Sequence, residues 1–205
     1  MATKTQKQNT ESEKVYFDIK MAHSEDTFRA LSHMQYDLFC TRNLILRTII
    51  GLAAIGFGVY KLGNWWAYLL IAYGAFQLTG KYSQANHTVR KLVNSIEESK
   101  MPFPSSEYLF EEHKMRVIST ADNEELSPVY YKDILKLGQD KDYYYIFPNS
   151  SGGYMIPRVQ LLGHENEFIA FLKSKTGQTI FSKFTPPVVA TIEQFRKKKN
   201  EPYHL

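Results

Sequence analysis

Side chains that could do chemistry are present in this chain, but none stands at a spacing that catalysis or metal binding requires. The six histidines, at positions 23, 33, 87, 113, 164 and 204, are scattered and give no metal-ligand spacing. Cys40 is the single cysteine, so it has no partner for a disulfide or a redox pair, and we interpret it as a packing residue. The sequence therefore predicts no metal site and no cysteine nucleophile.

Acidic and glycine pairs give equally weak signals. The carboxylates at 111–112 and 124–125 are paired by proximity only, which is typical of solvated acids. Gly152-Gly153 lacks the further glycines and the lysine of a phosphate-binding loop, and it indicates a hairpin turn. With no catalytic constellation in sight, we expect neither an enzyme nor a cofactor.

Tyrosines are the first group that favours binding. In the predicted strand 143–147, alternation places Tyr143 and Tyr145 on one face and Tyr144 on the other. Tyrosine is enriched in interfaces, so we take Tyr143 and Tyr145 as candidate binding residues. The alternative is that one face is core and the other ordinary strand surface. Five tyrosines lie on the two neighbouring predicted strands: Tyr130, Tyr131, Tyr143, Tyr144 and Tyr145.

The elements that would position these groups are arranged around an apolar stretch, residues 43–79, with a polar break at 61–64. Each arm is short, because a membrane span needs about 20 apolar residues and 17 run from Leu44 to Tyr60. Runs of this length also occur as buried core helices. Aromatic residues at the break and basic residues near the ends favour a two-helix transmembrane hairpin over residues 43–80. The candidate membrane-interface residues are Arg47, Lys61, Trp65 and Trp66.

Small residues recur on both arms at the spacing of helix contacts. We expect them to pack the two arms against each other, and a homo-oligomer interface is the alternative. These residues are Gly51, Ala54, Gly58, Ala67, Gly74 and Ala75.

Basic residues set the expected orientation. They flank the stretch on both sides, whereas the break offers only Lys61, so both flanks should be cytoplasmic and the break outside. The polar start of the chain lacks the apolar core of a signal peptide. We therefore predict a cell-membrane protein with two spans and cytoplasmic N- and C-termini. The flanking residues are Arg42, Arg47, Lys81, Arg90 and Lys91.

The net charge and its distribution limit the classes of partner that the chain is expected to bind. The net charge of +4 is modest, which argues against a nucleic-acid binder. Arg158, with Lys132 and Lys136, would form a basic edge able to hold anionic lipid headgroups. Residues 185–199 read as an amphipathic helix ending in the basic run 196–199, which would either lie on the anionic leaflet or pack on the domain.

The two flanks of the apolar stretch read as parts of one domain. Apolar residues alternate along 15–21, which indicates a half-buried strand, and a helix should begin at Ser24. The strand-rich part after the hairpin reads as an antiparallel meander, with one of its turns at 138–142. A single strand is not stable alone, so we expect the strand at 15–21 to pair with this part. The expected segments are 1–14 (disordered), 15–42 (strand and helix), 43–80 (hairpin), 81–104 (charged helix and linker), 105–177 (C-terminal domain) and 178–205 (basic amphipathic tail).

This layout resembles the YcxB-like family of small bacterial membrane proteins. The resemblance covers about residues 15–175 and implies an α+β membrane protein, in which the hairpin is inserted in a small pleckstrin-homology-like antiparallel sheet capped by a helix. It implies no catalytic residues. The matching segments are Tyr130-Tyr-Lys-Asp-Ile134, Asp142-Tyr-Tyr-Tyr-Ile146, Tyr154-Met-Ile-Pro-Arg158 and Phe168-Ile-Ala-Phe171.

Two classes of function follow from the layout. The first is a membrane-anchored, non-enzymatic binding or regulatory protein, whose cytosolic domain recognises a protein or a lipid; self-protection against membrane-active peptides is one role of this design. The second is an accessory subunit of a membrane transport or assembly complex. Only Gln77 and Thr79 are polar on the second arm, which argues against a conduction path. The expected partners are the bilayer and a protein, with further copies of the chain as the alternative, and no nucleic acid.

Overall fold

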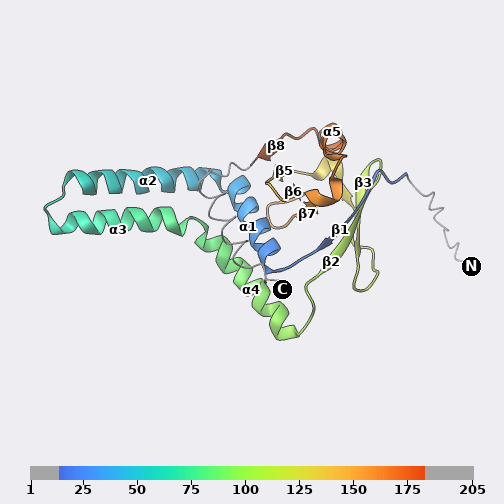
Figure 1. The fold of residues 1–205 in the computed structure, drawn as a ribbon, viewed down its shortest axis with the longest axis horizontal. Coiled ribbons are helices and arrows are strands. Elements are labelled where there is room, and N and C mark those ends of the chain that lie inside the picture. Colours follow the sequence, from blue (N-terminus) through green and yellow to red (C-terminus); the bar gives the residue numbers. More distant parts are fainter. Residues whose placement is uncertain (1–13, 183–205) are drawn as a thin grey trace, which may run out of the picture.

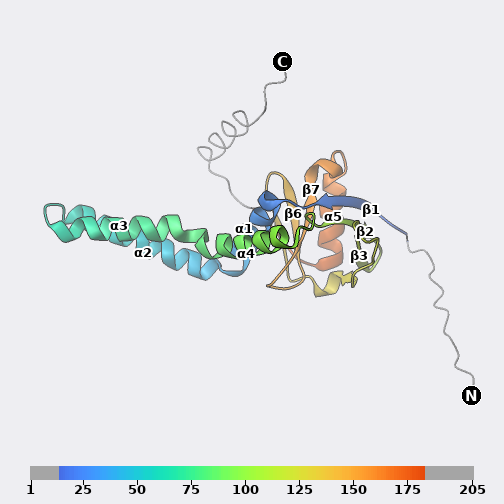
Figure 2. The same cartoon turned by 90° about the horizontal axis from the view of Figure 1, so that it is seen from below.

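The structure, a computed structural model, describes residues 14–182 of the chain. A long helical arm projects from an α+β body (Figure 1). The arm consists of α2 (Thr41–Tyr60) and α3 (Trp65–Thr79), and Figure 2 shows the two helices side by side along their length. The expected helix at 185–199 lies outside the described residues, as does the expected disordered start apart from Lys14.

The strand before the arm pairs with a strand after it, as predicted. β1 (Phe17–Ala22) runs antiparallel to β2 (Ser105–Phe110). Its alternation buries Ile19 and Met21 and leaves Asp18 and Lys20 on the other face. The first sheet continues with β3 (Lys114–Ser119) and β4 (Val129–Tyr130), in the order β1-β2-β3-β4. Residues on both sides of the arm therefore belong to one body.

A second sheet replaces the single meander that the sequence suggested. It contains β5 (Lys136–Gln139), β6 (Tyr143–Phe147), β7 (Tyr154–Pro157) and β8 (Ile180–Ser182), in the order β7-β6-β5-β8. β8 runs parallel to β5, so the body extends through residue 182, and the domain boundary predicted at 177 is too early. The other pairs of this sheet are antiparallel.

Gly138 explains why one predicted turn is a strand. The sequence placed a turn over 138–142, but β5 continues through Gln139. A Cβ at Gly138 would lie 2.9 Å from the Met34 sulfur, so glycine here permits close packing of a helix on the strand. The turn itself is held by Asp140, whose carboxylate accepts hydrogen bonds from the backbone of Asp142 and Tyr143.

Three helices complete the described body. α1 (Glu25–Phe39) begins at the predicted cap Ser24, which exchanges hydrogen bonds with Thr27 in a capping box. Cys40 separates α1 from α2, so the two are not one continuous helix. α4 (Ser83–Ser99) packs against α1, and α5 (Glu165–Thr176) covers the sheets. Short 3₁₀ turns occur at Gly80–Tyr82 (η1), Tyr131–Asp133 (η2) and Arg158–Leu161 (η3).

Aromatic side chains fill the core between the sheets and α5. Phe168 of α5 meets the rings of Phe17 and Phe110 edge-on, with centroids 5.1 and 5.2 Å apart. Edge-to-face contacts of this kind stabilise a core beyond the burial of apolar area alone. Because these rings come from β1, β2 and α5, the core joins the segments before and after the arm.

Candidate functional site

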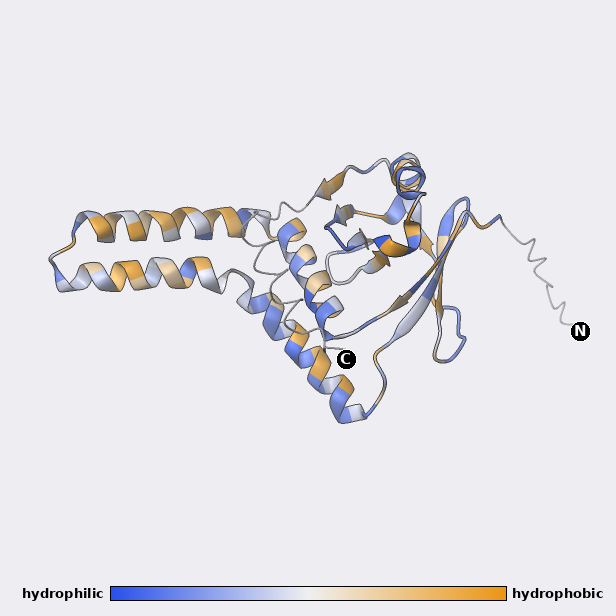
Figure 3. Ribbon diagram, viewed as in Figure 1, coloured by the Kyte–Doolittle hydropathy of each residue, from blue (hydrophilic) through white to orange (hydrophobic). Residues whose placement is uncertain are grey.

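The outer surface of the arm is apolar and uncovered. Figure 3 shows hydrophobic residues distributed along α2 and α3, well away from the body. Leu52, Leu69 and Phe76 keep 59, 59 and 69% of their surfaces exposed. Of the most apolar window of α2, only 11% is buried, unlike the core helix of a soluble protein. Among the described residues, α2 is the one helix that is long and apolar enough to cross a membrane.

Small residues close the inner side of the arm. Gly51 and Gly58 of α2 and Ala67 and Gly74 of α3 are buried between the helices. A Cβ at Gly74 would lie 2.6 Å from the carbonyl oxygen of Gly51, so the two backbones touch at this point. The predicted packing of one arm helix on the other is confirmed for these four residues. Ala75 faces outward instead.

The predicted interface residues lie at the two ends of the arm. Trp65 is 76% exposed at the tip, where Lys61 lies 4.7 Å from the ring of Tyr60. Trp66, also at the tip, packs on Phe57 with centroids 6.1 Å apart. At the other end, the guanidinium of Arg47 donates to the Gly80 carbonyl at 3.5 Å. The arm therefore has an aromatic tip at one end, and its other end, the base, joins the body.

A polar network fixes the base of the arm to the body. The Tyr82 hydroxyl, in η1, donates to the Asp37 carboxylate of α1 at 2.8 Å. The His33 ring stacks on Tyr82 with centroids 4.2 Å apart, and its Nε2 lies 2.7 Å from Asn86 Oδ1 of α4. Burial and the neighbouring Asp37 both raise the pKa of Tyr82, which keeps this hydroxyl protonated and donating. The network links α1, α4 and the end of α3.

The exposed tyrosine face expected from the sequence is not formed. Tyr131, Tyr144 and Tyr145 are buried, and of the five only Tyr130 is largely exposed. Both faces of β6 are covered: Tyr144 packs on Phe168 of α5, and Phe147, which shares the face of Tyr145, packs on Phe39 of α1. The Tyr145 hydroxyl donates to Asp140 inside the fold.

The predicted basic edge is also dispersed. Lys136 stands where β5 begins, opposite Phe147, and its ammonium donates to the Leu38 carbonyl at 2.5 Å. Arg158 follows β7 at the opposite end of the sheet, where it binds Glu165 at 2.8 Å. The two cations therefore hold helices in place at different ends.

Lys132 lies apart from both of these cations. Its ammonium is 5.6 Å from the Tyr130 ring centroid, beside a separate surface hollow that Lys175 also lines. The three cations that the sequence analysis grouped therefore lie in three separate places on the body and do not form one basic edge.

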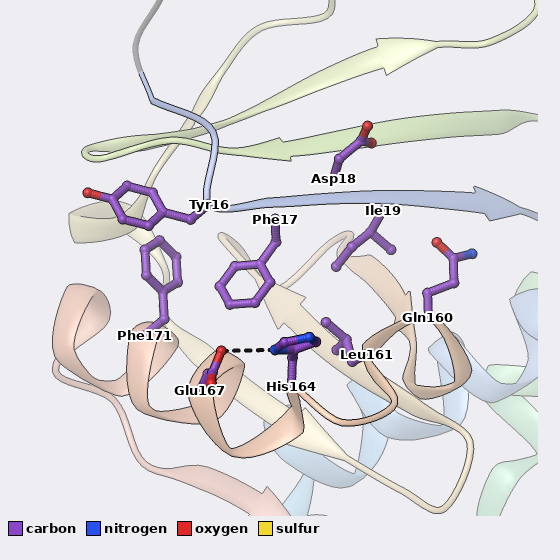
Figure 4. Close-up of a pocket in the computed structure, with 9 residues that line it drawn as sticks. All are labelled: Tyr16, Phe17, Asp18, Ile19, Gln160, Leu161, His164, Glu167 and Phe171. Atoms are coloured by element: carbon purple, nitrogen blue, oxygen red, sulfur yellow. Dashed lines mark hydrogen bonds and ion pairs between the residues drawn. The ribbon is translucent and has the colours of Figure 1, made fainter.

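A cleft runs along β1. It has a volume of about 460 Å³ and lies between β1 and the segment η3–α5 (Figure 4). We call it the β1 cleft. Tyr16 and Phe171 pack at one end with ring centroids 5.3 Å apart, and His164 lies 3.0 Å from the Glu167 carboxylate at the rim. Its lining residues are Tyr16, Phe17, Asp18, Ile19, Gln160, Leu161, His164, Glu167 and Phe171.

The edge of β1 that faces away from β2 borders this cleft. The backbone N–H of His23 donates to the Pro104 carbonyl, and in an antiparallel pair such hydrogen-bonded positions alternate. Phe17, Ile19 and Met21 therefore bond to β2, whereas Asp18 and Lys20 turn their N–H and C=O groups to the free edge. At Lys20 both groups are taken by the side-chain amide of Gln160, at 2.8 and 2.5 Å.

A charged contact closes the end of the cleft near Tyr16. The Tyr16 hydroxyl and the Lys175 ammonium both donate to the Glu112 carboxylate. The hydrogen bond from Lys175 is the main reason why the pKa of Glu112 is lowered, and the hydrogen bond to Glu112 raises the pKa of Tyr16. The carboxylate thereby ties the start of β1 to α5.

The arrangement offers surfaces for binding. Within residues 14–182, no three His, Cys, Asp or Glu side chains are grouped to hold a metal ion. Comparisons with protein-family models, curated proteins and solved structures find no match to this chain. The resemblance to the YcxB-like family therefore stays a prediction.

Sequence reasoning missed the β1 cleft. Its residues come from separate segments, 16–19 and 160–171, and no local motif connects them. The one local signal of the cleft was Tyr16, an aromatic residue that does not belong to the apolar face formed by alternate residues of the strand at 15–21.

Proposed function

We propose that this protein is a membrane-anchored, non-enzymatic binding protein. In this proposal the arm crosses a bilayer twice, and the α+β body presents the β1 cleft on one side. The observation that carries it is the uncovered apolar surface of α2 and α3, which pack on each other and on little else. Contiguous exposed apolar surfaces of this extent mark contact with a membrane or a protein.

The fold supports two spans over one. β1 precedes the arm and β2 follows it, and the two strands pair in one sheet. Both flanks must then lie on the same side of the membrane, so a chain that crosses through α2 has to return. The 15 residues of α3 rise about 22 Å. This is less than the hydrocarbon thickness of about 30 Å, and a short span is accommodated by local thinning of the bilayer and by snorkelling of flanking residues.

Charge supports a cytoplasmic body. Arg42, Arg90 and Lys91 are exposed near the base of the arm, whereas the turn at the tip carries Lys61 alone. Basic residues accumulate on the cytoplasmic side. The resemblance to the YcxB-like family supports the same layout, with a small pleckstrin-homology-like body capped by α5. A role in self-protection against membrane-active peptides is one use of such a body.

Cysteine labelling in intact cells tests this topology. In a Cys40→Ser background, Asn64→Cys at the tip should react with a membrane-impermeant maleimide. Glu124→Cys, on an exposed loop of the body, should react only after the cells are permeabilised. Release of the chain from membranes by alkaline carbonate, or labelling of Glu124→Cys from outside, contradicts the proposal.

The role of accessory subunit in a membrane complex is favoured by one polar pair. The Gln77 amide donates to the Tyr73 hydroxyl at 2.7 Å on the exposed side of α3. Polar groups inside a bilayer often face another helix. Native electrophoresis in mild detergent tests this second candidate, because Gln77→Leu should shrink a complex that depends on the pair and leave a lone anchor unchanged.

A further inference from the structure

We propose that the β1 cleft binds an extended peptide segment of alternating apolar and basic residues, which adds as a strand to the free edge of β1. This inference rests on the proposed role as a binding protein and names the class of its partner. Main-chain hydrogen bonds would supply affinity, and the alternating side chains would supply specificity, as in other strand additions.

The free edge provides the hydrogen bonds. The register directs the N–H and C=O of Asp18 away from β2, to the side on which Gln160, a lining residue of the cleft, binds Lys20. A residue opposite Asp18 in an added antiparallel strand would form both bonds of a hydrogen-bonded pair. β7 packs beside β1 but does not pair with it.

Gln160 shows that this edge accepts an amide. Its side chain donates to the Lys20 carbonyl and accepts from the Lys20 N–H, which are the two bonds that one residue of an antiparallel neighbouring strand makes. Two residues along β1, Asp18 offers the same pair of groups. Gln160 thus stands in for one residue of a strand and sets the point from which a bound segment would extend.

The cleft accommodates the side chains on one face of such a segment. Figure 4 shows Phe17 and Ile19 directed into the cleft and Asp18 directed to the opposite face. The residues before and after the one opposite Asp18 would therefore point to the apolar floor, which includes Phe171 and Leu161. A volume of about 460 Å³ lies within the range of about 300–1,000 Å³ of ligand sites.

Charge selects a basic residue for the position opposite Asp18. Directly opposed residues share a face, where opposite charges are favourable and like charges are not. Glu107 of β2 lies on this face near Asp18 and pairs with Lys20 at 3.2 Å. Burial and the charge of Glu107 raise the pKa of Asp18, whereas Lys20 lowers it. A lysine or arginine of the ligand would place a further cation beside Asp18 and offset its repulsion by Glu107. Glu167 adds a second carboxylate at the rim of the floor.

The test uses the full chain in neutral phosphatidylcholine nanodiscs, with empty discs as background, so that a basic probe is not attracted by anionic lipid. The probe is a fluorescein-labelled octapeptide of alternating leucine and lysine, followed by fluorescence anisotropy. We expect saturable binding, and binding at least about tenfold weaker for the peptide with glutamate in place of lysine. N-methylation of the peptide at alternate residues should weaken binding about tenfold or more, because it removes main-chain hydrogen bonds.

Two substitutions of one residue separate backbone from charge. Asp18→Pro removes the outward N–H, which β2 does not use, and proline is tolerated on such an edge. It should weaken binding of the lysine peptide about tenfold or more. Asp18→Asn keeps the N–H, so it should retain the peptide while reducing the preference for lysine over glutamate. Circular dichroism melts establish that both variants are folded.

Several results would overturn the proposal. These are equal binding of the N-methylated peptide, equal binding by Asp18→Pro, or no saturable binding of any peptide. If the chain dimerises in the discs and Asp18→Pro abolishes the dimer, the free edge of β1 binds a second copy of the chain and not a peptide. None of these results affects the labelling of Asn64→Cys, so a failed peptide site is distinguishable from a failed membrane anchor.

Discussion

Gly74→Ala should separate the two helices of the arm. A methyl group at Gly74 would lie 2.6 Å from the carbonyl oxygen of Gly51 and 2.6 Å from Cγ1 of Ile55. The first neighbour is backbone and cannot rotate away. The distance from the new methyl carbon to the Gly51 oxygen must grow from 2.6 Å to the 3.4 Å of an ordinary contact, so the two helices must move apart by about 0.8 Å.

Gly56→Ala is the matched control. Gly56 also lies in an arm helix, but a methyl group there meets nothing within 4 Å. Both changes gain up to about 1 kcal/mol of helix propensity, so the gain cancels when the variants are compared. The remaining difference in the free energy of unfolding is the cost of overpacking, which should make Gly74→Ala about 1–3 kcal/mol less stable than Gly56→Ala. Gly56→Ala should match or exceed the unaltered chain in stability.

Tryptophan fluorescence isolates the arm in this measurement. The chain has two tryptophans, Trp65 and Trp66, and both lie at the tip. We would titrate sodium dodecyl sulfate into the full chain in maltoside micelles and follow the emission, since the contact of Trp66 with Phe57 is lost when the helices part. If Gly74→Ala unfolds at the same detergent fraction as Gly56→Ala, the close approach of the two backbones does not stabilise the arm.

Three further predictions concern the body. Phe168→Ala should lower the free energy of unfolding by about 3–5 kcal/mol, measured in urea, because it empties the fully buried centre of the aromatic core; a loss below 1 kcal/mol would contradict that role. Burial lowers the pKa of His23 below its usual 6.5, so the unfolded chain binds the proton more readily than the folded chain. The contribution of neutral His23 to stability is therefore complete above pH 6.5 and is lost as the pH falls below 6.5. His23→Phe, which can keep the stack on Phe28, should flatten the change in Tm between pH 7.5 and 5.5, and an unchanged slope would exclude His23 as its source. Removal of residues 1–22 deletes β1 and should leave residues 105–182 sensitive to protease; a protected fragment would show that the sheet does not need β1.

Local patterns predicted the elements whose geometry is local. The alternation along 15–21 gave β1 and its buried face, and the spacing of Gly51, Gly58 and Gly74 gave the packing of the arm. Such patterns depend only on strand and helix periods. The need of a lone strand for a partner also predicted the pairing of β1 with the later sheet.

Features set by distant segments were not predictable in this way. Alternation showed which tyrosines of β6 share a face, but α1 and α5 decide that both faces are covered. Gly138 signalled a turn because its close contact with Met34 is invisible in the local sequence. The β1 cleft likewise depends on Gln160 reaching a strand 140 residues earlier.

The position of β1 ahead of the arm gives the molecule an order of assembly. Ala22 and its register partner Ser105 are separated by the 82 residues 23–104. At a synthesis rate of about 5–20 residues per second, β1 waits about 4–16 s before its partner strand has been made. During that interval Ile19 and Met21 have no sheet to cover them. The body is thus the last part to close, and with the arm inserted as proposed, its closure means that the chain has already returned to the side on which it began.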